Sequence, residues 1–529
     1  MIGQGIPALF AATTASLSGT ARGAGSAVAN TPLSPVGDTE LIEWAAMICG
    51  ALLLGRAATA SSAHESRLDG WVSAGAWGFV LLPLLLSALV FSALRLGSPL
   101  PGGLATLVVV LGAAAVLTLI ARSGPRHEAA SVPAPNLALR QPSFFNRAVL
   151  LLPLAAGALA LWSAGDWDDP IPGGSWDSMA IWNTGARVLV RGDGDWPALF
   201  RNRVIGHPDY PLLVPGTLAS LWSSVGGESH TAPRTVALSF LVGLGLMMFS
   251  AARRFCGQRS AALATALLLS LPILAEMVRA QLADAALAML LLAATTVFAS
   301  HFAPARNQRL PAWLGGLALG ALPWCKNEGA VLAVVVLGAY ICCLGFTRAR
   351  GDNSAPGLKR ELPLALAGAS LPLAILVCFK LSWAPNDPMF HDVGTTLLTY
   401  LPDPARWSTA FGGFMDQLNP WTDGSTWGLA TSADRWGYAW PVAALLALMG
   451  LVRGRGFPRD HRLFLGLVAL GSFAAYFAVY VTTPARSQSW HIESSLFRLL
   501  LQLFPTVWLW ACAMALPRSK TPAISARRT

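Results

Sequence analysis

Acidic residues and tryptophans gather in one stretch of the sequence, GDWDDPIPGGSWDSMAIWN, which follows an apolar segment ending near Trp162. Asp166, Asp168, Asp169 and Asp177 lie within twelve residues of each other. A carboxylate that is held in place can act as a general base when a proton donor comes within hydrogen-bond reach. A solvated loop acid is the ordinary alternative, and we favour it for Asp168 and Asp169.

Asp177 is the best placed of these acids. Prolines and glycines at 170–174 interrupt the chain, and Ser175 can cap a helix that begins near Trp176. Asp177 would then lie in the first turn of a helix at the membrane surface, bracketed by Trp176 and Trp182. Trp favours membrane–water interfaces, and its ring faces can also stack on sugars. A catalytic role and a favourable helix N-terminal charge both fit Asp177 at this point.

Further ionisable residues lie at the ends of apolar segments. They are His207-Pro208-Asp209-Tyr210, Glu276 with Arg279 and Asp284, Lys326-Asn327-Glu328, and Trp490-His491-Ile492-Glu493 with Arg498. Ionisable groups at membrane depth are costly, so they are candidates for function by default. Snorkelling to the interface is the alternative for Glu276, and a local ion pair is the alternative for Lys326 beside Glu328. A site just above the bilayer would explain why all of them fall on one side.

The apolar segments that position these groups predict an all-α, polytopic integral membrane protein. Of the 529 residues, 54% are hydrophobic and 12% charged, whereas soluble domains carry about 25% charged residues. A helix of about 20 apolar residues crosses the hydrocarbon core and satisfies its own backbone groups there. We predict about 13 transmembrane helices, near 41–56, 71–94, 102–121, 148–164, 235–252, 260–275, 284–300, 313–324, 329–346, 362–382, 436–452, 463–482 and 496–515.

Lysine and arginine predict the orientation, because cytoplasmic loops carry their excess. With the N-terminus outside, six loops and the C-terminal tail lie inside and hold 23 of the 37 Lys and Arg residues. The net charge of +10 is therefore a topology signal, and nothing in it predicts nucleic-acid binding. A full span at 210–226 would reverse every later loop, so we predict an interfacial or re-entrant helix there.

Five regions follow from these patterns. They are a disordered tail 1–37, three extra N-terminal transmembrane helices 38–147, a core 148–382 with the outside loop 165–234, an outside loop 383–435, and C-terminal helices with a basic cytoplasmic tail 436–529. The seven cysteines form no CxxC pair and lie mostly in apolar segments. We therefore expect neither disulfides nor a cysteine metal site.

The order of these features resembles the GT-C glycosyltransferases, specifically bacterial relatives of protein O-mannosyltransferases and of the lipid A aminoarabinose transferase. The matching positions are Asp177, His207-Pro208-Asp209-Tyr210-Pro211, Arg253-Arg254-Phe255-Cys256-Gly257, Pro272 and Asp284. The resemblance is clearest across 145–345. This sequence departs from the family pattern at Ser178, where an acid often follows the first-loop Asp, at Asp209, which replaces a second Pro, and in its three extra helices.

The resemblance implies a GT-C-like fold and a multi-pass enzyme of the bacterial inner membrane with an extracytoplasmic active site. Its partners would be a polyprenyl-phosphate-linked sugar donor, a lipid, glycan or protein acceptor, and the surrounding lipids. Asp177 would be the general base and Asp284 the second carboxylate. The candidates for the donor phosphate are His207, Lys326 and Arg279, and those for substrate contact are Trp176, Trp182, Tyr210, Glu328, His491 and Arg498. No cofactor is required, although Asp177 and Asp284 could hold a divalent metal.

The residues alone leave three other functions possible. A lipid or glycolipid transporter would place its ionisable residues near mid-span rather than at span ends. An O-antigen polymerase or ligase would carry Arg-rich outside loops. A non-catalytic membrane scaffold would leave the acid- and Trp-rich outside loops without an explanation.

Overall fold

The computed structural model describes a helical chain. The described residues are 36–59, 67–123, 149–164, 174–192, 194–202, 205–303, 309–350, 358–385, 398–421, 432–453, 461–483 and 487–516. They contain helices and no strand, which confirms the predicted all-α class. The predicted disordered tail lies outside the described residues except for Val36 and Gly37, which begin the first helix.

The helices follow the apolar segments closely. They are α2 (Val36–Ala58), α3 (Arg67–Arg95), α4 (Gly103–Ser123), α6 (Leu151–Ala164), η1 (Ser178–Asn183), α7 (Thr184–Arg191), α8 (Trp196–Arg201), α9 (Leu213–Val225), α10 (Ala232–Cys256), α11 (Gln258–Leu269), α12 (Pro272–Arg279), α13 (Asp284–His301), α14 (Ala312–Cys325), α15 (Glu328–Ala349), α16 (Leu358–Ser382), α18 (Pro404–Leu418), α19 (Ser432–Trp436), α20 (Ala439–Val452), α21 (His461–Thr482) and α22 (Gln488–Ala515).

Seven of the described helices are long and apolar enough to cross a membrane, namely α3, α10, α13, α15, α16, α21 and α22. The predicted span at 260–275 is divided into α11 and α12, which meet at 56° and count as an eighth candidate if they form one span. Pro272 begins α12, and its missing N–H accounts for a break at this point. The polytopic class is confirmed, whereas the count of about 13 spans is not, because the apolar parts of α2 (Ala45–Ala58) and α4 (Gly103–Leu119), like helices α6, α14 and α20, have only 10–17 residues.

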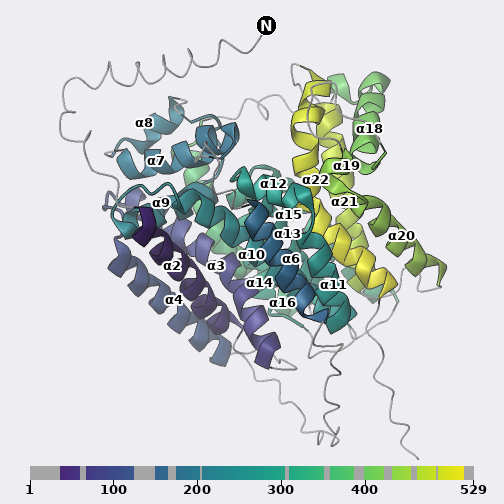
Figure 1. Ribbon diagram of the computed structural model, residues 1–529, viewed down its shortest axis with the longest axis horizontal. Coiled ribbons are helices and arrows are strands. Elements are labelled where there is room, and N and C mark those ends of the chain that lie inside the picture. The colour runs from purple at the N-terminus through teal and green to yellow at the C-terminus, as the bar shows by residue number, and fades with distance from the viewer. Residues whose placement is uncertain are drawn as a thin grey trace, which may run out of the picture.

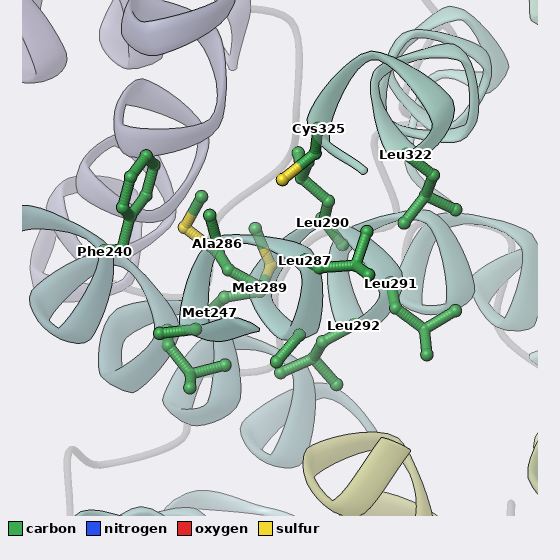
Figure 2. Close-up of a cluster of buried hydrophobic side chains, with 14 of the residues drawn as sticks. Phe240, Met247, Ala286, Leu287, Met289, Leu290, Leu291, Leu292, Leu322 and Cys325 are labelled. Atoms are coloured by element: carbon green, nitrogen blue, oxygen red, sulfur yellow. The ribbon is translucent and has the colours of Figure 1, made fainter. Parts of the chain in front are cut away.

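Helix α13 lies at the centre of the helix bundle. All of its residues from Asp284 to His301 are buried, and its side chains pack against α10, α14 and α22. Figure 2 shows this core, where Leu287 and Leu291 of α13 lie near Leu322 of α14, and Ala286 lies near Phe240 of α10. A helix that is apolar on every face is buried in this way. The position of α13 fixes the depth of Asp284, its first residue.

Helices α14 and α16 approach each other closely because glycines line their contact. A Cβ atom at Gly316 of α14 would collide with the Ala365 carbonyl, and one at Gly368 of α16 would collide with the Trp313 carbonyl. A Cβ at Gly320 would lie 2.7 Å from Pro372 Cγ. Small residues permit such close backbone contact between membrane helices. This contact sets the end of α16 beside the end of α14.

Short helices gather at one end of the bundle. Helices α7, α8, α12, α18 and α19 lie towards the top of Figure 1, where α13 and α15 begin and α14 ends. Helix α9, within the stretch 210–226, has 13 residues and a length of roughly 20 Å, which is less than the roughly 30 Å of a hydrocarbon core. It is not among the candidate spans, as expected, and its place at the membrane interface stays a prediction.

Candidate active site

Ser175 begins the helix that carries Asp177, as predicted. Its hydroxyl oxygen accepts a hydrogen bond from the Ser178 N–H at 3.4 Å. Its own N–H and hydroxyl donate to the Ala280 carbonyl, both at 3.2 Å. The helix continues as the π-helical segment η1, a geometry that is rare and often marks functional sites. The start of this helix is therefore attached to the junction between α12 and α13, close in sequence to Asp284.

Six of the predicted site residues form one continuous series of polar contacts, which we call the ionic chain. In order of contact it contains Asp177, Arg498, Asp284, Lys326, Glu328 and Tyr210. Arg498 on α22 connects the two aspartates. One guanidinium nitrogen donates to Asp177 Oδ2, and two others lie 3.3 Å from Asp284 Oδ2. Residues that are 321 positions apart in sequence thus make a direct ion pair.

Lys326 continues the ionic chain beyond Asp284. Its Nζ lies 3.2 Å from Asp284 Oδ1 and 3.4 Å from Glu328 Oε1. The Tyr210 hydroxyl donates to the same Glu328 oxygen at 3.5 Å. The expected closeness of Lys326 to Asp284 is therefore confirmed. Burial lowers the pKa of Lys326, but the carboxylates of Asp284 and Glu328 outweigh that effect and the net pKa shift is upward, so the ammonium form persists.

The two aspartates occupy different environments. The Asp284 side chain is fully buried and accepts hydrogen bonds from Lys326, Arg498 and Gln502. The Asp177 side chain is 28% exposed, and Arg498 contacts its Oδ2. Solvent therefore reaches the Asp177 carboxylate but not that of Asp284. Sequence reasoning missed Gln502, although its spacing of four residues from Arg498 places both on one face of α22.

Burial also corrects the role predicted for Lys326. Only 2% of its side chain is exposed, and its ammonium lies between two carboxylates. Direct contact with a donor phosphate is therefore blocked in this conformation. His207 is more accessible, with 52% of its side chain exposed. Arg279 is also exposed, but of the two exposed candidates for the donor phosphate it is His207 that adjoins the ionic chain, through its stacking on Tyr210.

Aromatic rings hold Tyr210 in place. The His207 ring stacks on it with a centroid separation of 4.8 Å, and the Trp182 ring lies 5.6 Å away. Burial above all, followed by the nearby Glu328 carboxylate, raises the pKa of Tyr210 well above its ordinary value. Its hydroxyl therefore stays protonated and remains a donor to Glu328. Trp182 is only 1% exposed, so it supports Tyr210 and cannot offer the sugar-facing surface that was predicted.

The other predicted residues lie around the ionic chain. Trp176 is exposed beside Asp177. His491 is half-buried on α22, with its ring 4.9 Å from that of Tyr480. Arg279 is exposed at the end of α12 and is not part of the ionic chain.

Glu276, for which snorkelling was the alternative, pairs with Arg435 of α19 at 3.2 Å. The Arg435 guanidinium lies 3.8 Å from the Phe497 ring centroid. No sequence pattern pointed to Arg435. It attaches the second predicted outside loop to α12 and α22, next to the residues that hold Asp177.

Because Trp182 is buried and Trp176 is exposed, substituting each of them by Ala should have a different effect. Trp182→Ala removes a buried indole and should destabilise the protein by about 3–5 kcal/mol. Trp176→Ala should leave the thermal midpoint within about 1 °C of wild type and raise the KM for the acceptor. Thermal unfolding in detergent and steady-state kinetics separate the two effects. A Trp176→Ala protein with unchanged KM would remove Trp176 from the substrate-binding surface.

A cavity of about 900 Å³ lies elsewhere at the same end of the bundle. Its walls include the turn between α3 and α4, with Arg95, and the indoles of Trp196, Trp222 and Trp383. No residue of the ionic chain lines it. The cavity and the ionic chain are therefore separate features.

Asp177 and Asp284, the two predicted metal ligands, both belong to the ionic chain. Arg498 lies between the predicted ligands Asp177 and Asp284 and contacts both. Within the part of the chain that the structure describes, no group of three or more His, Cys, Asp or Glu side chains is arranged to hold a metal ion. A guanidinium therefore supplies positive charge between the two carboxylates.

The helices that are long enough to cross a membrane define a polytopic membrane protein. Its charged, partly exposed candidate site lies towards one end of the helix bundle. Residues 207–370 match the model of the family described as dolichyl-phosphate-mannose-protein mannosyltransferase. This match confirms the predicted resemblance to GT-C glycosyltransferases and supports a membrane glycosyltransferase of that type. Four members of the ionic chain lie within the match and two, Asp177 and Arg498, lie outside it. Comparisons with curated proteins and with solved structures give no match.

Proposed function

We propose that the protein transfers a sugar from a polyprenyl-phosphate-linked donor to a hydroxyl of a lipid, glycan or protein acceptor on the extracytoplasmic side of the membrane. The observation that carries this proposal is the ionic chain, in which the partly exposed Asp177 carboxylate is held by Arg498 of α22 beside the first residues of α13 and α15. The family match to residues 207–370 supports the same class of reaction. A lipid-linked donor would keep its chain in the bilayer while its sugar reaches this site.

Asp177 is the proposed general base. Arg498 holds one carboxylate oxygen, while the partly exposed side chain can accept the proton of the acceptor hydroxyl. The acceptor oxygen then forms a bond to the anomeric carbon as the bond from that carbon to the phosphate oxygen breaks. The polyprenyl phosphate leaves with the electron pair, and its developing charge would be stabilised by the exposed His207 and by the positive field of Arg498.

Asp284 has a different proposed role. Its buried carboxylate accepts from Lys326, Arg498 and Gln502, so it fixes the two cations in place. A carboxylate with these partners is a poor proton acceptor, because protonation would neutralise its charge and weaken its charge-assisted hydrogen bonds with the two cations. We therefore assign to Asp284 the positioning of Arg498, and through it of Asp177.

The test uses the purified full-length protein and polyprenyl-phosphate-mannose as the first donor probe. Release of polyprenyl phosphate that depends on a hydroxyl acceptor, and that is lost in Asp177→Asn, is the expected result. Mass spectrometry of cell-envelope glycans with and without the protein then identifies the acceptor class. Unchanged envelope glycans together with no turnover of any polyprenyl-phosphate sugar would defeat the proposal.

A separate prediction concerns which loops face the outside of the cell and which face the cytoplasm. In a protein whose seven native cysteines are replaced, Ser408→Cys on the exposed face of α18 should react with a membrane-impermeant thiol reagent in intact cells. Arg455→Cys, in a predicted inside loop, should react only after the cells are opened, because the Lys and Arg distribution places that loop in the cytoplasm. Labelling of Arg455→Cys in intact cells would reverse the orientation.

A further inference from the structure

Three segments that are distant in sequence meet at Lys380, near the C-terminal end of α16. The Lys380 Nζ donates to the Asp209 carbonyl at 2.6 Å and to Asn327 Oδ1 at 2.9 Å. The Asn327 amide donates in turn to Asp209 Oδ2. Each pair of these residues is thus joined by a hydrogen bond. We call Lys380, Asn327 and Asp209 the Lys380 clamp.

The clamp holds both sides of one end of the ionic chain. Asp209 immediately precedes Tyr210, and Asn327 lies between Lys326 and Glu328. The distance of 3.5 Å between the Tyr210 hydroxyl and Glu328 Oε1 therefore depends on two backbone segments that the clamp fixes to each other. His207 belongs to the same loop, with its Nδ1 4.0 Å from Asp209 Oδ1.

The position of Lys380 follows from helix packing. The glycine-lined contact between α14 and α16 brings the ends of the two helices together, and Asn327 directly follows α14. Lys380 lies in the last turn of α16, where the helix dipole favours a cation. Its ammonium carries three N–H groups in a compact head, so it can donate to a carbonyl and an amide oxygen at once.

We propose that Lys380 is a positioning residue for the transfer reaction, which sets His207 and Tyr210 against Lys326 and Glu328 without touching the substrate. This inference rests on the proposed function and adds a residue that lies beyond the family match at 207–370. The hydrogen bonds of Lys380 to Asp209 and Asn327 join it to the residues that adjoin Tyr210, Lys326 and Glu328. Its effect on catalysis is therefore exerted through the loop that contains Asp209.

The experiment compares Lys380→Met with a matched control at the same helix end. Arg201 of α8 donates to the Ser382 carbonyl at 2.9 Å, so Arg201→Met also removes a cationic anchor from the end of α16 but leaves the clamp intact. Hydrogen–deuterium exchange of residues 205–212 in the full-length protein measures the clamp directly. Turnover of polyprenyl-phosphate-mannose measures its consequence.

Lys380→Met should speed exchange in 205–212 by about tenfold or more and lower kcat by about 10- to 100-fold, since small displacements of reacting groups have effects of that size. The KM for the donor should change by less than about threefold, because the affected geometry matters most in the transition state. Lys380→Arg, which keeps the charge and several donors, should restore most of kcat. Asn327→Ala combined with Lys380→Met should be less than additive, since both remove the same clamp.

Three results would overturn the positioning role. The first is unchanged exchange in 205–212 for Lys380→Met, and the second is faster exchange with wild-type kcat. The third is an equal loss of kcat in Arg201→Met, because the effect would then be a general loosening of α16. A wild-type protein that turns over no polyprenyl-phosphate sugar and leaves the envelope glycans unchanged would defeat the proposed function alone, since the exchange comparison still decides whether the clamp exists.

Discussion

Replacing Asp177 by Asn should lower the turnover of a polyprenyl-phosphate sugar by about 10²–10⁴-fold, the usual contribution of a general base. The amide keeps an oxygen that can accept from Arg498, as Asp177 Oδ2 does, but it cannot take a proton from an acceptor hydroxyl. The side chain is partly exposed and its helix begins at Ser175. The fold and the thermal midpoint should therefore change little. Single-turnover kinetics with saturating donor would measure the loss of the chemical step.

Three further variants make this result specific. Asp168→Asn and Asp169→Asn, both outside the described residues, should keep wild-type turnover. Glu328→Gln tests the other carboxylate that could accept a proton, because Glu328 Oε2 has no hydrogen-bond partner among the described residues. If Glu328→Gln is inactive while Asp177→Asn turns over normally, Glu328 is the base. If one of the two earlier aspartates is required instead, the base lies earlier in the loop.

Lys326→Met should destabilise the protein by about 3–5 kcal/mol and lower turnover by about 100-fold. Lys326 and Asp284 form an ion pair in which 2% of one side chain and none of the other is exposed. Removing the lysine leaves a fully buried carboxylate with one cation fewer, which is costly in a medium of low polarity. The remaining cation, Arg498, would be drawn towards Asp284 and away from Asp177. Thermal unfolding and donor turnover report the two effects.

The double variant Lys326→Met with Asp284→Asn separates stability from catalysis. It removes both charges of the buried pair, so most of the lost stability should return, as it often does when a buried ion pair is replaced as a unit. Turnover should stay low, because Arg498 loses the carboxylate that positions it. A Lys326→Met protein as stable as wild type would contradict the buried pair. A double variant with wild-type turnover would contradict the positioning role of Asp284.

Much of the fold was predictable because membrane helices are defined by local composition. Each predicted apolar segment contains a described helix, and the ionisable residues at the segment ends were identifiable as candidates because charges are costly in hydrocarbon. The count of spans was less predictable. The predicted span at 260–275 bends at Pro272 by 56°, and in five other segments the apolar part of the helix has only 10–17 residues. Hydrophobicity predicts which residues avoid water, but it does not predict how deep a helix lies in the bilayer or whether the helix is straight.

For the candidate site too, some features were predictable from the sequence and others depended on the tertiary structure. The sequence alone singled out Asp177, Asp284 and Lys326, because acids and cations at span ends are conspicuous against an apolar background. Only the tertiary structure decided that Asp177 is partly exposed and Asp284 buried, since both contact Arg498, which lies 321 residues from the first of them.

The remaining roles depended on the same kind of packing. Burial of Trp182 under Tyr210, and the convergence of Lys380 with Asn327 and Asp209, also bring together segments far apart in the chain. Local sequence sets which side chains are available and at which end of a span each lies. The contacts between spans set which side chain faces the substrate and which is enclosed, because exposure is a property of the packed neighbours and not of the residue itself.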